Sequence, residues 1–127
     1  MSRKKGIFAV LLGILVLLLT LYGGIKYRTS YAKTKIMASS SVNGQYNLVI
    51  YMIGEPDWPF GTTHCRFELF EENKRIVKYP FSIKNDGANA HEENFNVIWS
   101  SDSVSVTVSG EEQDDIIYVL NYDGTIE

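Results

Sequence analysis

A histidine beside the single cysteine is the first pair of residues in this sequence whose types could do chemistry. A thiol activated by a neighbouring imidazole is a common enzymatic nucleophile, and His64 and Cys65 carry those groups. In a strand, however, adjacent side chains point to opposite faces, so His64 would not reach the thiol of Cys65. Cys65 instead alternates with Phe67 and Leu69, which predicts a buried, unreactive side chain. One cysteine also excludes an internal disulfide and a clustered-cysteine metal site.

Residues 54–62, GEPDWPFGT, hold two large aromatic rings beside two prolines. Proline restricts its own backbone and that of the residue before it, so Trp58 and Phe60 would be presented by a stiff loop. Exposed aromatic rings dominate many protein-binding interfaces. We therefore predict that Asp57, Trp58, Pro59 and Phe60 bind a protein partner. The alternative is that both rings fold back to cover the core.

Acidic residues gather in three segments that the strand pattern leaves as loops: 54–62, 82–93 and 110–115. They hold nine of the 15 acidic residues, with Lys84 as the only basic one. The predicted partner-binding residues therefore also include Asp86, Glu92 and Glu93. Carboxylates in loops can bind calcium, but an EF-hand spacing is absent and solvated carboxylates are the alternative. We predict no metal site and no cofactor.

Sequence motifs for catalysis are also missing. The chain contains no phosphate-binding loop, no G-x-S-x-G and no H-E-x-x-H, and the strand pattern brings no Ser/His/Asp group together. The other histidine, His91, lies among acidic residues and is expected to be solvated. We therefore expect a protein that is not an enzyme, and a net charge of −3 argues against nucleic acid as a partner.

An uncharged apolar run of 19 residues, 7–25, lies between two basic clusters. As a helix it would span about 28 Å, close to the thickness of a bilayer's hydrocarbon core. We predict a basic tail over residues 1–6 and a transmembrane helix over 7–25. A cleaved signal peptide is the alternative, although the run is long for one and lacks a small-x-small cleavage pattern near its end.

The orientation follows less directly, because basic residues flank the run on both sides. We favour a single-pass protein of the cell membrane with its C-terminal domain outside the cytoplasm. Along the helix, Gly6, Gly13 and Thr20 recur every seven residues, and Ala9 lies three positions after Gly6, so small residues share one face. Such a stripe lets another helix approach closely, which makes a subunit or regulator of a membrane complex an alternative function. Chance is the competing explanation of the stripe.

The remaining chain predicts a tether over residues 26–41 and a β-domain over 42–127. Five of the 12 basic residues lie in the first 28 positions, so residues 29–127 hold seven basic and all 15 acidic residues, a net charge of −8. Six segments have strand patterns: 45–53, 63–70, 75–81, 94–99, 104–109 and 116–122. This predicts an all-β fold, a small antiparallel β-sandwich or open barrel.

Strands that run up and down from the tether would place the short turns at 71–74 and 100–103 near the membrane. The three acidic loops would then lie together at the far end, where a rigid β-frame can present a binding surface. A Greek-key connection would break this grouping. The expected function is therefore a membrane-anchored, extracytoplasmic binding or accessory module, with a cation-dependent enzyme as a second alternative.

Several short motifs resemble those of a family of single-pass membrane proteins of unknown function from Gram-positive bacteria. They are the strand start Ser41-Val42-Asn43-Gly44-Gln45-Tyr46, the loop 54–61, and a hairpin with Trp99, Asp102 and Val104-Ser105-Val106. The resemblance covers most of residues 41–122. It implies a location in the cell envelope and an all-β fold, and it implies no activity.

Overall fold

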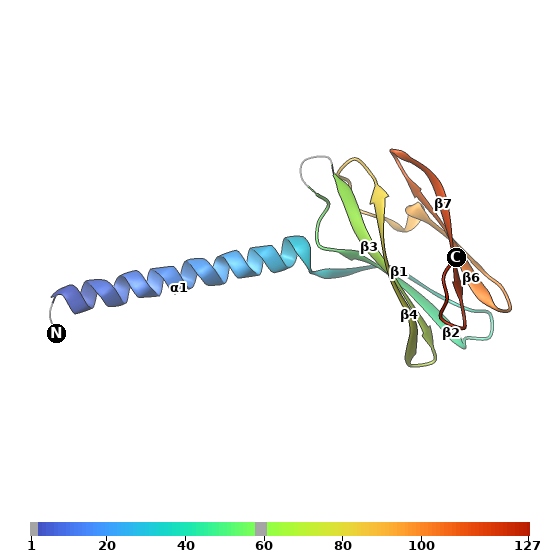
Figure 1. Ribbon diagram of the computed structural model, residues 1–127, viewed down its shortest axis with the longest axis horizontal. Helices are drawn as coiled ribbons and strands as arrows, with labels where there is room; N and C mark the ends of the chain where they lie inside the picture. The colour runs from blue at the N-terminus through green and yellow to red at the C-terminus, as the bar shows by residue number, and fades with distance from the viewer. Residues whose placement is uncertain (1–2, 58–60) are drawn as a thin grey trace.

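The computed structural model describes residues 3–57 and 61–127, which form one apolar helix followed by an all-β domain (Figure 1). The elements are α1 (Arg3–Ser30), β1 (Lys33–Ser40), β2 (Tyr46–Ile53), β3 (Thr62–Glu71), β4 (Lys74–Lys84), the short 3-10 helix η1 (Glu92–Asn94), β5 (Phe95–Trp99), β6 (Ser103–Gly110) and β7 (Gln113–Asn121).

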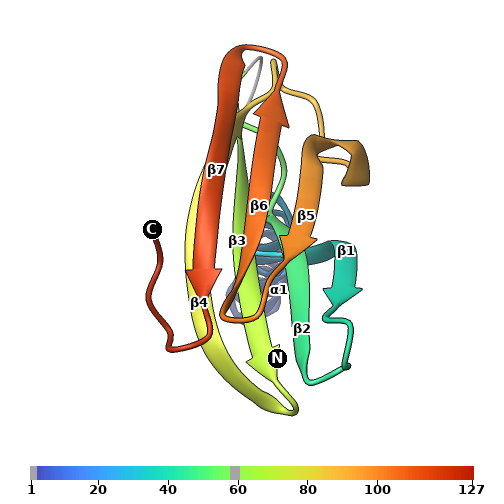
Figure 2. The same ribbon diagram turned by 90° about the vertical axis from the view of Figure 1, so that its right-hand side faces the viewer.

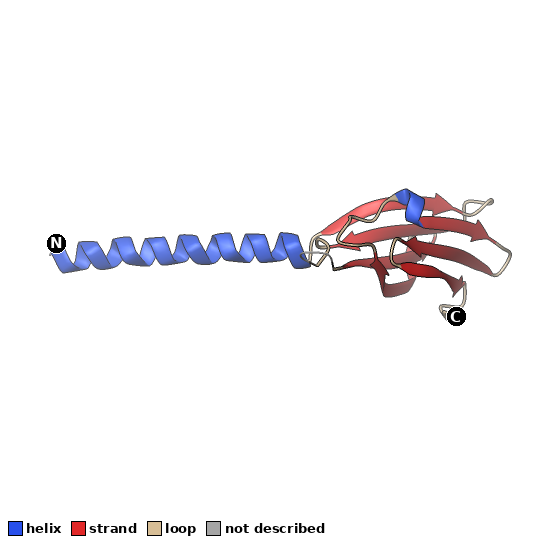
Figure 3. Ribbon diagram, turned by 90° about the horizontal axis from the view of Figure 1, so that it is seen from above, coloured by secondary structure: helices blue, strands red, loops and turns tan. Residues whose placement is uncertain are grey.

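Helix α1 extends beyond the predicted apolar run at both ends. Its 28 residues span about 42 Å, and its large apolar side chains are exposed along its length. The helix is therefore long and apolar enough to cross a membrane. It projects away from the β-domain as a single rod (Figure 3).

The joint between helix and domain is short and hydrogen-bonded. The N–H groups of Tyr31 and Ala32 both donate to the carbonyl of Tyr27 at 2.8 Å, which closes the last turn of the helix. The N–H of Gly54 then donates to the carbonyl of Ala32 at 2.7 Å. Only residues 31 and 32 separate α1 from β1, so the prediction of a tether over 26–41 is wrong.

Most of that predicted tether is strand β1, which pairs antiparallel with β2 from Lys33 opposite Ile53 to Ser40 opposite Asn47. Its sequence, KTKIMASS, is too polar to have a clear strand pattern. β2 has an apolar pattern on both faces, and its free edge offers unpaired N–H and C=O groups. Pairing with that edge therefore outweighs the weak local propensity of β1.

Two sheets form a sandwich, one with the order β1-β2-β3-β4 and one with the order β5-β6-β7, and all neighbouring strands are antiparallel. The core between them is made of alternate, fully buried side chains, including Leu48, Ile50, Phe67, Val106 and Leu120. The rings of Phe67 and Phe81 stack with centroids 4.0 Å apart. The four-stranded sheet lies between α1 and the three-stranded sheet (Figure 2). The predicted small β-sandwich is confirmed, with seven strands among the described residues.

The additional strand reverses one sequence-based prediction. The three acidic loops do lie together, because Gly87 donates to the carbonyl of Gly61 and Glu112 donates to the carbonyl of Lys84. They do not lie at the far end, however. β1 adds one reversal of chain direction, so the loop after β2 lies beside Ala32 and the end of α1. The short turns after β3 and β5 lie at the opposite end.

Candidate functional site

The residues predicted to bind a partner are not gathered into one site. Trp58, Pro59 and Phe60 lie outside the described residues. Asp86 is exposed, in a turn with a φ of 52°. Glu92 and Glu93 lie in η1 and line a surface hollow with His91, whereas Asp57 lines a different hollow.

The hollow at Asp57 contains a Ser/His/Asp group, which sequence patterns did not reveal. His64 Nε2 lies 3.1 Å from both carboxylate oxygens of Asp57, and Ser82 Oγ lies 3.4 Å from His64 Nδ1. His64 and Ser82 are opposite each other on β3 and β4, and Asp57 reaches them from the loop after β2. The prediction that no such group forms is therefore wrong, because cross-strand register and a loop conformation create it.

Cys65 faces away from this group, as predicted. The side chain is 2% exposed and belongs to the core. Burial raises the pKa of its thiol to about 12, so the thiol stays protonated near neutral pH. An activated His64–Cys65 pair is thereby excluded.

A buried carboxylate lies on the outer surface of the four-stranded sheet. Glu68 is only 2% exposed although it points away from the core, because three cationic side chains cover it. Its oxygens accept from Arg75 Nη1 at 2.9 Å, Arg66 Nη2 at 3.2 Å and Lys33 Nζ at 3.4 Å. Lys33 Nζ also lies 4.2 Å from the centroid of the Tyr51 ring. We call Glu68, Lys33, Arg66 and Arg75 the Glu68 cluster.

The pKa of Glu68 reflects two opposed effects. Burial is the larger single effect and raises the pKa, whereas hydrogen bonds from Arg75 and Lys33 lower it, together with the charges of Lys33 and Arg66. The combined effect of the cations prevails, and the pKa lies below its ordinary value. The carboxylate is therefore charged at neutral pH. Three cations around one carboxylate leave the cluster with a positive charge of two.

An aromatic groove opens at the end of the sandwich far from α1. Tyr46, at the start of β2, stacks on Tyr122 with ring centroids 3.7 Å apart and an angle of 10° between the planes. Trp99 Nε1 donates to Ser39 Oγ at 2.9 Å, and the Tyr122 hydroxyl donates to the carbonyl of Ser100 at 2.8 Å. The distal groove, as we call it, has a volume of about 500 Å³ and is lined by Ser41, Val42, Asn43, Gln45, Tyr46, Trp99, Ser100, Ser101 and Tyr122.

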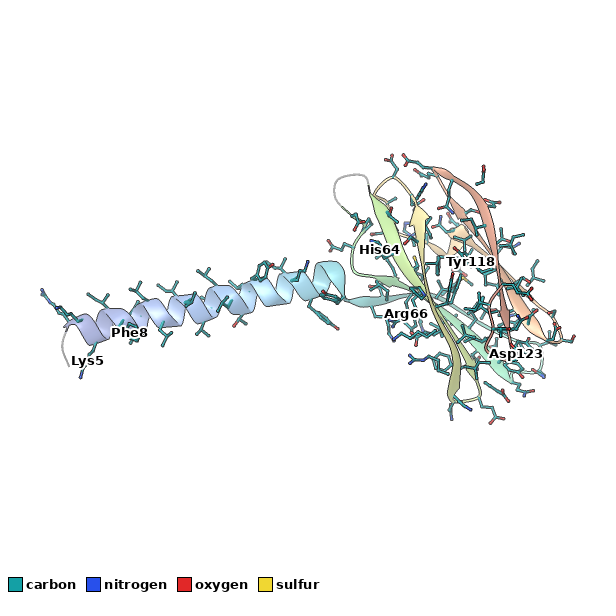
Figure 4. The ribbon with its side chains drawn as sticks, in the orientation of Figure 1. Lys5, Phe8, His64, Arg66, Tyr118 and Asp123 are labelled. Atoms are coloured by element: carbon teal, nitrogen blue, oxygen red, sulfur yellow. The ribbon has the colours of Figure 1, made fainter. Side chains whose placement is uncertain are left out.

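The position of the distal groove follows from the topology. It is formed by the β1–β2 turn, the β5–β6 turn and the residue after β7, all at the end opposite the acidic loops. Asp123, next to Tyr122, lies on the side of the domain away from the helix, whereas His64 and Arg66 lie on the helix side (Figure 4). Sequence reasoning missed this groove, because its residues come from three separate turns. The one local signal was the turn sequence of residues 41–46.

The predicted helix interface lies on a free surface in this structure. Gly6, Ala9, Gly13 and Thr20 are all in α1, and an added Cβ at Gly6 or Gly13 would meet no described atom within 4 Å beyond the adjacent backbone of the helix. The Thr20 hydroxyl donates to the carbonyl of Val16 at 2.9 Å, within the helix. Within residues 3–57 and 61–127, no group of three His, Cys, Asp or Glu side chains could hold a metal ion.

Comparison of the chain with protein-family models, with curated proteins and with solved structures finds no match in any of the three. The resemblance of residues 41–122 to Gram-positive membrane proteins therefore stays a prediction.

Proposed function

We propose that the chain is a membrane-anchored, extracytoplasmic binding module that presents the distal groove to a protein partner. The observation that carries this proposal is the arrangement along the molecule. An apolar helix is joined through two residues to one end of a rigid sandwich, and the groove opens at the other end. A helix anchored in a bilayer would therefore hold the groove away from the membrane surface.

The composition of the distal groove suits a peptide segment. The stacked rings of Tyr46 and Tyr122 are held in place, so binding would cost little side-chain entropy. Val42 is 102% exposed, and the amides of Asn43 and Gln45 lie beside it. An exposed apolar side chain next to aromatic rings and polar groups is the usual composition of a protein-binding surface.

Arg3, Lys4 and Lys5 precede the apolar run of residues 7–25, and Lys26, Arg28, Lys33 and Lys35 follow it. Because the two flanks carry similar charge, the orientation has to be decided by experiment. Alkaline carbonate extraction tests the anchor, and protease treatment of intact cells that carry a C-terminal epitope tag tests the orientation. We expect the chain to stay in the membrane pellet and the tag to be lost from intact cells. Release by carbonate would refute the anchor, and loss of the tag only after lysis would place the domain inside.

Binding at the distal groove is tested by photo-crosslinking in cells. A photoreactive amino acid at Val42 lies in the groove, whereas the same amino acid at Ile117 lies on the outer face of β7, where the side chain is 62% exposed. We expect a discrete crosslinked product from position 42 that position 117 does not give. The same products from both positions would contradict the proposal.

A second candidate function is a subunit of a membrane complex that associates through α1. It is favoured by the exposure of α1 on all sides and by the open space around Gly6 and Gly13. Replacement Gly13→Leu would fill the small-residue stripe, whereas Leu12→Ala changes the neighbouring surface. Loss of crosslinking within the membrane in the first variant alone would support this function.

We do not propose a hydrolase, despite the Asp57–His64–Ser82 group. Its hydroxyl-to-imidazole distance of 3.4 Å is long, and the side chains of His64 and Asp57 are 49% and 58% exposed. Water would weaken the electrostatic stabilisation on which such a catalytic group depends. Reaction with a fluorophosphonate probe tests this directly. Labelling that disappears in Ser82→Ala would show an activated serine and overturn our view.

A further inference from the structure

Charge is segregated between the two sheets of the sandwich. The seven Lys and Arg residues of 31–127 all belong to β1, β3 and β4, and thus to the four-stranded sheet. Residues 91–127, which form the other sheet, contain no Lys or Arg and nine acidic residues. Residues 31–90 hold seven basic and six acidic residues, a net charge of +1, whereas residues 91–127 have a net charge of −9. The domain is therefore dipolar, with its acidic sheet on the side away from α1 (Figure 2).

Strand register places most of these cations on one surface. Lys35 is opposite Tyr51, which is opposite Arg66, and all three point away from the core that Cys65 and Phe67 face. Lys78 is opposite Glu68 on the same outer surface. We define the basic face by six residues: Lys33, Lys35, Arg66, Arg75, Lys78 and Lys84.

Few acidic groups compensate this surface. Among the described residues, Glu68 lies under the cations, and Asp57 and Asp114 line the hollow at the His64 end of the face, beside Lys84. Six cations and three carboxylates leave a net charge of about +3 by simple charge counting. Among the described residues, the buried Nε of Arg66 has no hydrogen-bond partner. Hydrogen-bond donors therefore also exceed acceptors in the Glu68 cluster.

The basic face is turned toward the side of the domain from which α1 extends. The four-stranded sheet separates the helix from the acidic sheet, and Arg66 is seen on the helix side (Figures 2 and 4). The two-residue joint holds β1, with Lys33 and Lys35, directly beside the end of the helix. If α1 spans a bilayer, this face is therefore within reach of the lipid headgroups.

We propose that the basic face binds the anionic headgroups of the membrane in which α1 is anchored. The four-stranded sheet then lies against the bilayer surface, while the acidic sheet and the distal groove point away from it. This inference rests on the anchor proposed above. Its physical basis is that the anchor holds the domain near the surface, so several weak charge contacts act at a high local concentration.

The acidic loops strengthen the preference for one orientation. They lie at the end of the sandwich that adjoins α1, and an anionic surface repels them while it attracts the basic face. The domain would therefore tilt about its joint until the outer surface of the four-stranded sheet meets the headgroups. At ~0.15 M salt such forces act over about 8 Å, and at ~1 M over about 3 Å. The orientation should accordingly be lost at high salt.

The test uses the full chain, reconstituted into phosphatidylcholine vesicles with or without a third of phosphatidylglycerol. A fluorophore is attached at Ala38→Cys, on the outer surface of β1, or at Asn96→Cys, on the outer surface of β5. Both positions are exposed and lie on the edge strand of a sheet. Cys65 is buried with a pKa of about 12 and should not react. A lipid with a quencher on its headgroup then reports which surface lies near the bilayer.

We expect quenching of the label at position 38 to be at least twofold stronger in anionic than in neutral vesicles, and to fall to the neutral level at high salt. The label at position 96 should be weakly quenched in both. Equal quenching at position 38 in the two lipids, or stronger quenching at 96 in anionic lipid, would overturn the proposal.

A matched pair of double variants tests the role of the basic face. Lys35→Gln with Lys78→Gln removes two positive charges from the face but leaves the Glu68 cluster intact. Asn96→Asp with Ile117→Asp changes the net charge equally, at exposed positions on the outer surface of the other sheet. With the label at position 38, the first pair should lose at least half of the lipid-dependent quenching, and the second should keep it. Equal losses in both would refute a specific face.

Vesicle flotation separates this proposal from the anchor on which it rests. A chain that does not float with neutral vesicles has no anchor, and the proposed function fails with it. A chain that floats but shows no lipid-dependent quenching is anchored without docking, and only the present inference fails.

Discussion

Removal of the carboxylate from Glu68 is the sharpest test of how the four-stranded sheet is held together. In Glu68→Gln, Lys33, Arg66 and Arg75 lose the carboxylate that they share, whose oxygens lie 2.9–3.4 Å from their nitrogen atoms. Breaking a buried ion pair by removal of one partner costs about 3–5 kcal/mol. Because Lys33 and Arg75 are 43% and 45% exposed, water screens part of the repulsion that remains.

We therefore expect the free energy of unfolding to fall by about 2 kcal/mol in Glu68→Gln. For a domain of this size, that corresponds to a decrease in melting temperature of about 8–16 °C. The assay is thermal and urea unfolding of the full chain in detergent micelles, followed by circular dichroism. Glu71→Gln is the matched control, because it lies on the same strand and its carboxylate accepts a long, 3.4 Å bond from the exposed amide of Gln45. This control should change stability by less than about 0.5 kcal/mol.

The pH dependence of the free energy of unfolding is a second test of the role of Glu68. The pKa of folded Glu68 lies below its ordinary value of 4.5, so the unfolded chain binds the proton more tightly. The contribution of the carboxylate to stability is then fully present above that ordinary value, and is lost as the pH falls through the folded pKa. The stability difference between wild type and Glu68→Gln should narrow in that range. A difference that is absent at neutral pH, or unchanged in acid, would refute the reasoning.

Three further predictions follow from single contacts. Cys65 should resist maleimide at neutral pH and react only after denaturation, because its buried thiol has a pKa of about 12; fast labelling of the folded chain would contradict this. Trp99→Phe should cost about 1 kcal/mol, measured by urea unfolding, through loss of the bond to Ser39, and an unchanged midpoint would show that this bond contributes nothing. Gly110→Ala should lower the free energy of unfolding by about 1–3 kcal/mol in the same assay, because its Cβ would lie 2.6 Å from Ile83 Cγ2. An unchanged urea midpoint would mean that the neighbouring strands accommodate the methyl group without cost.

Much of the fold could be predicted from local patterns. Alternation at Val104, Val106 and Val108 predicted β6, and these side chains are fully buried. The apolar run from residue 7 predicted α1, since uncharged residues on all sides of a helix have no place in a domain this small. The short turns at 71–74 and 100–103 predicted two hairpins, which are β3–β4 and β5–β6. Each of these features depends on residues close together in the chain.

The errors share a physical origin in pairing between distant segments. β1 has a weak strand pattern and is ordered by the edge of β2, and this one strand moves the acidic loops from the far end to the helix end. The Asp57–His64–Ser82 group depends on the register between β3 and β4. These contacts cannot be predicted from the spacing of residues along the chain, because the pairing and register of a strand depend on its packing in the whole sheet.

By itself, the sequence determined an apolar helix followed by an all-β domain, the burial of Cys65 and the separation of charges along the chain. The tertiary structure alone decided where those charges lie in space. It placed Glu68 beneath three cations, assembled the distal groove from three turns, and turned the basic face toward α1. The reason is that composition and periodicity describe each segment against water, whereas a surface is made by segments that become neighbours only when the sheets form.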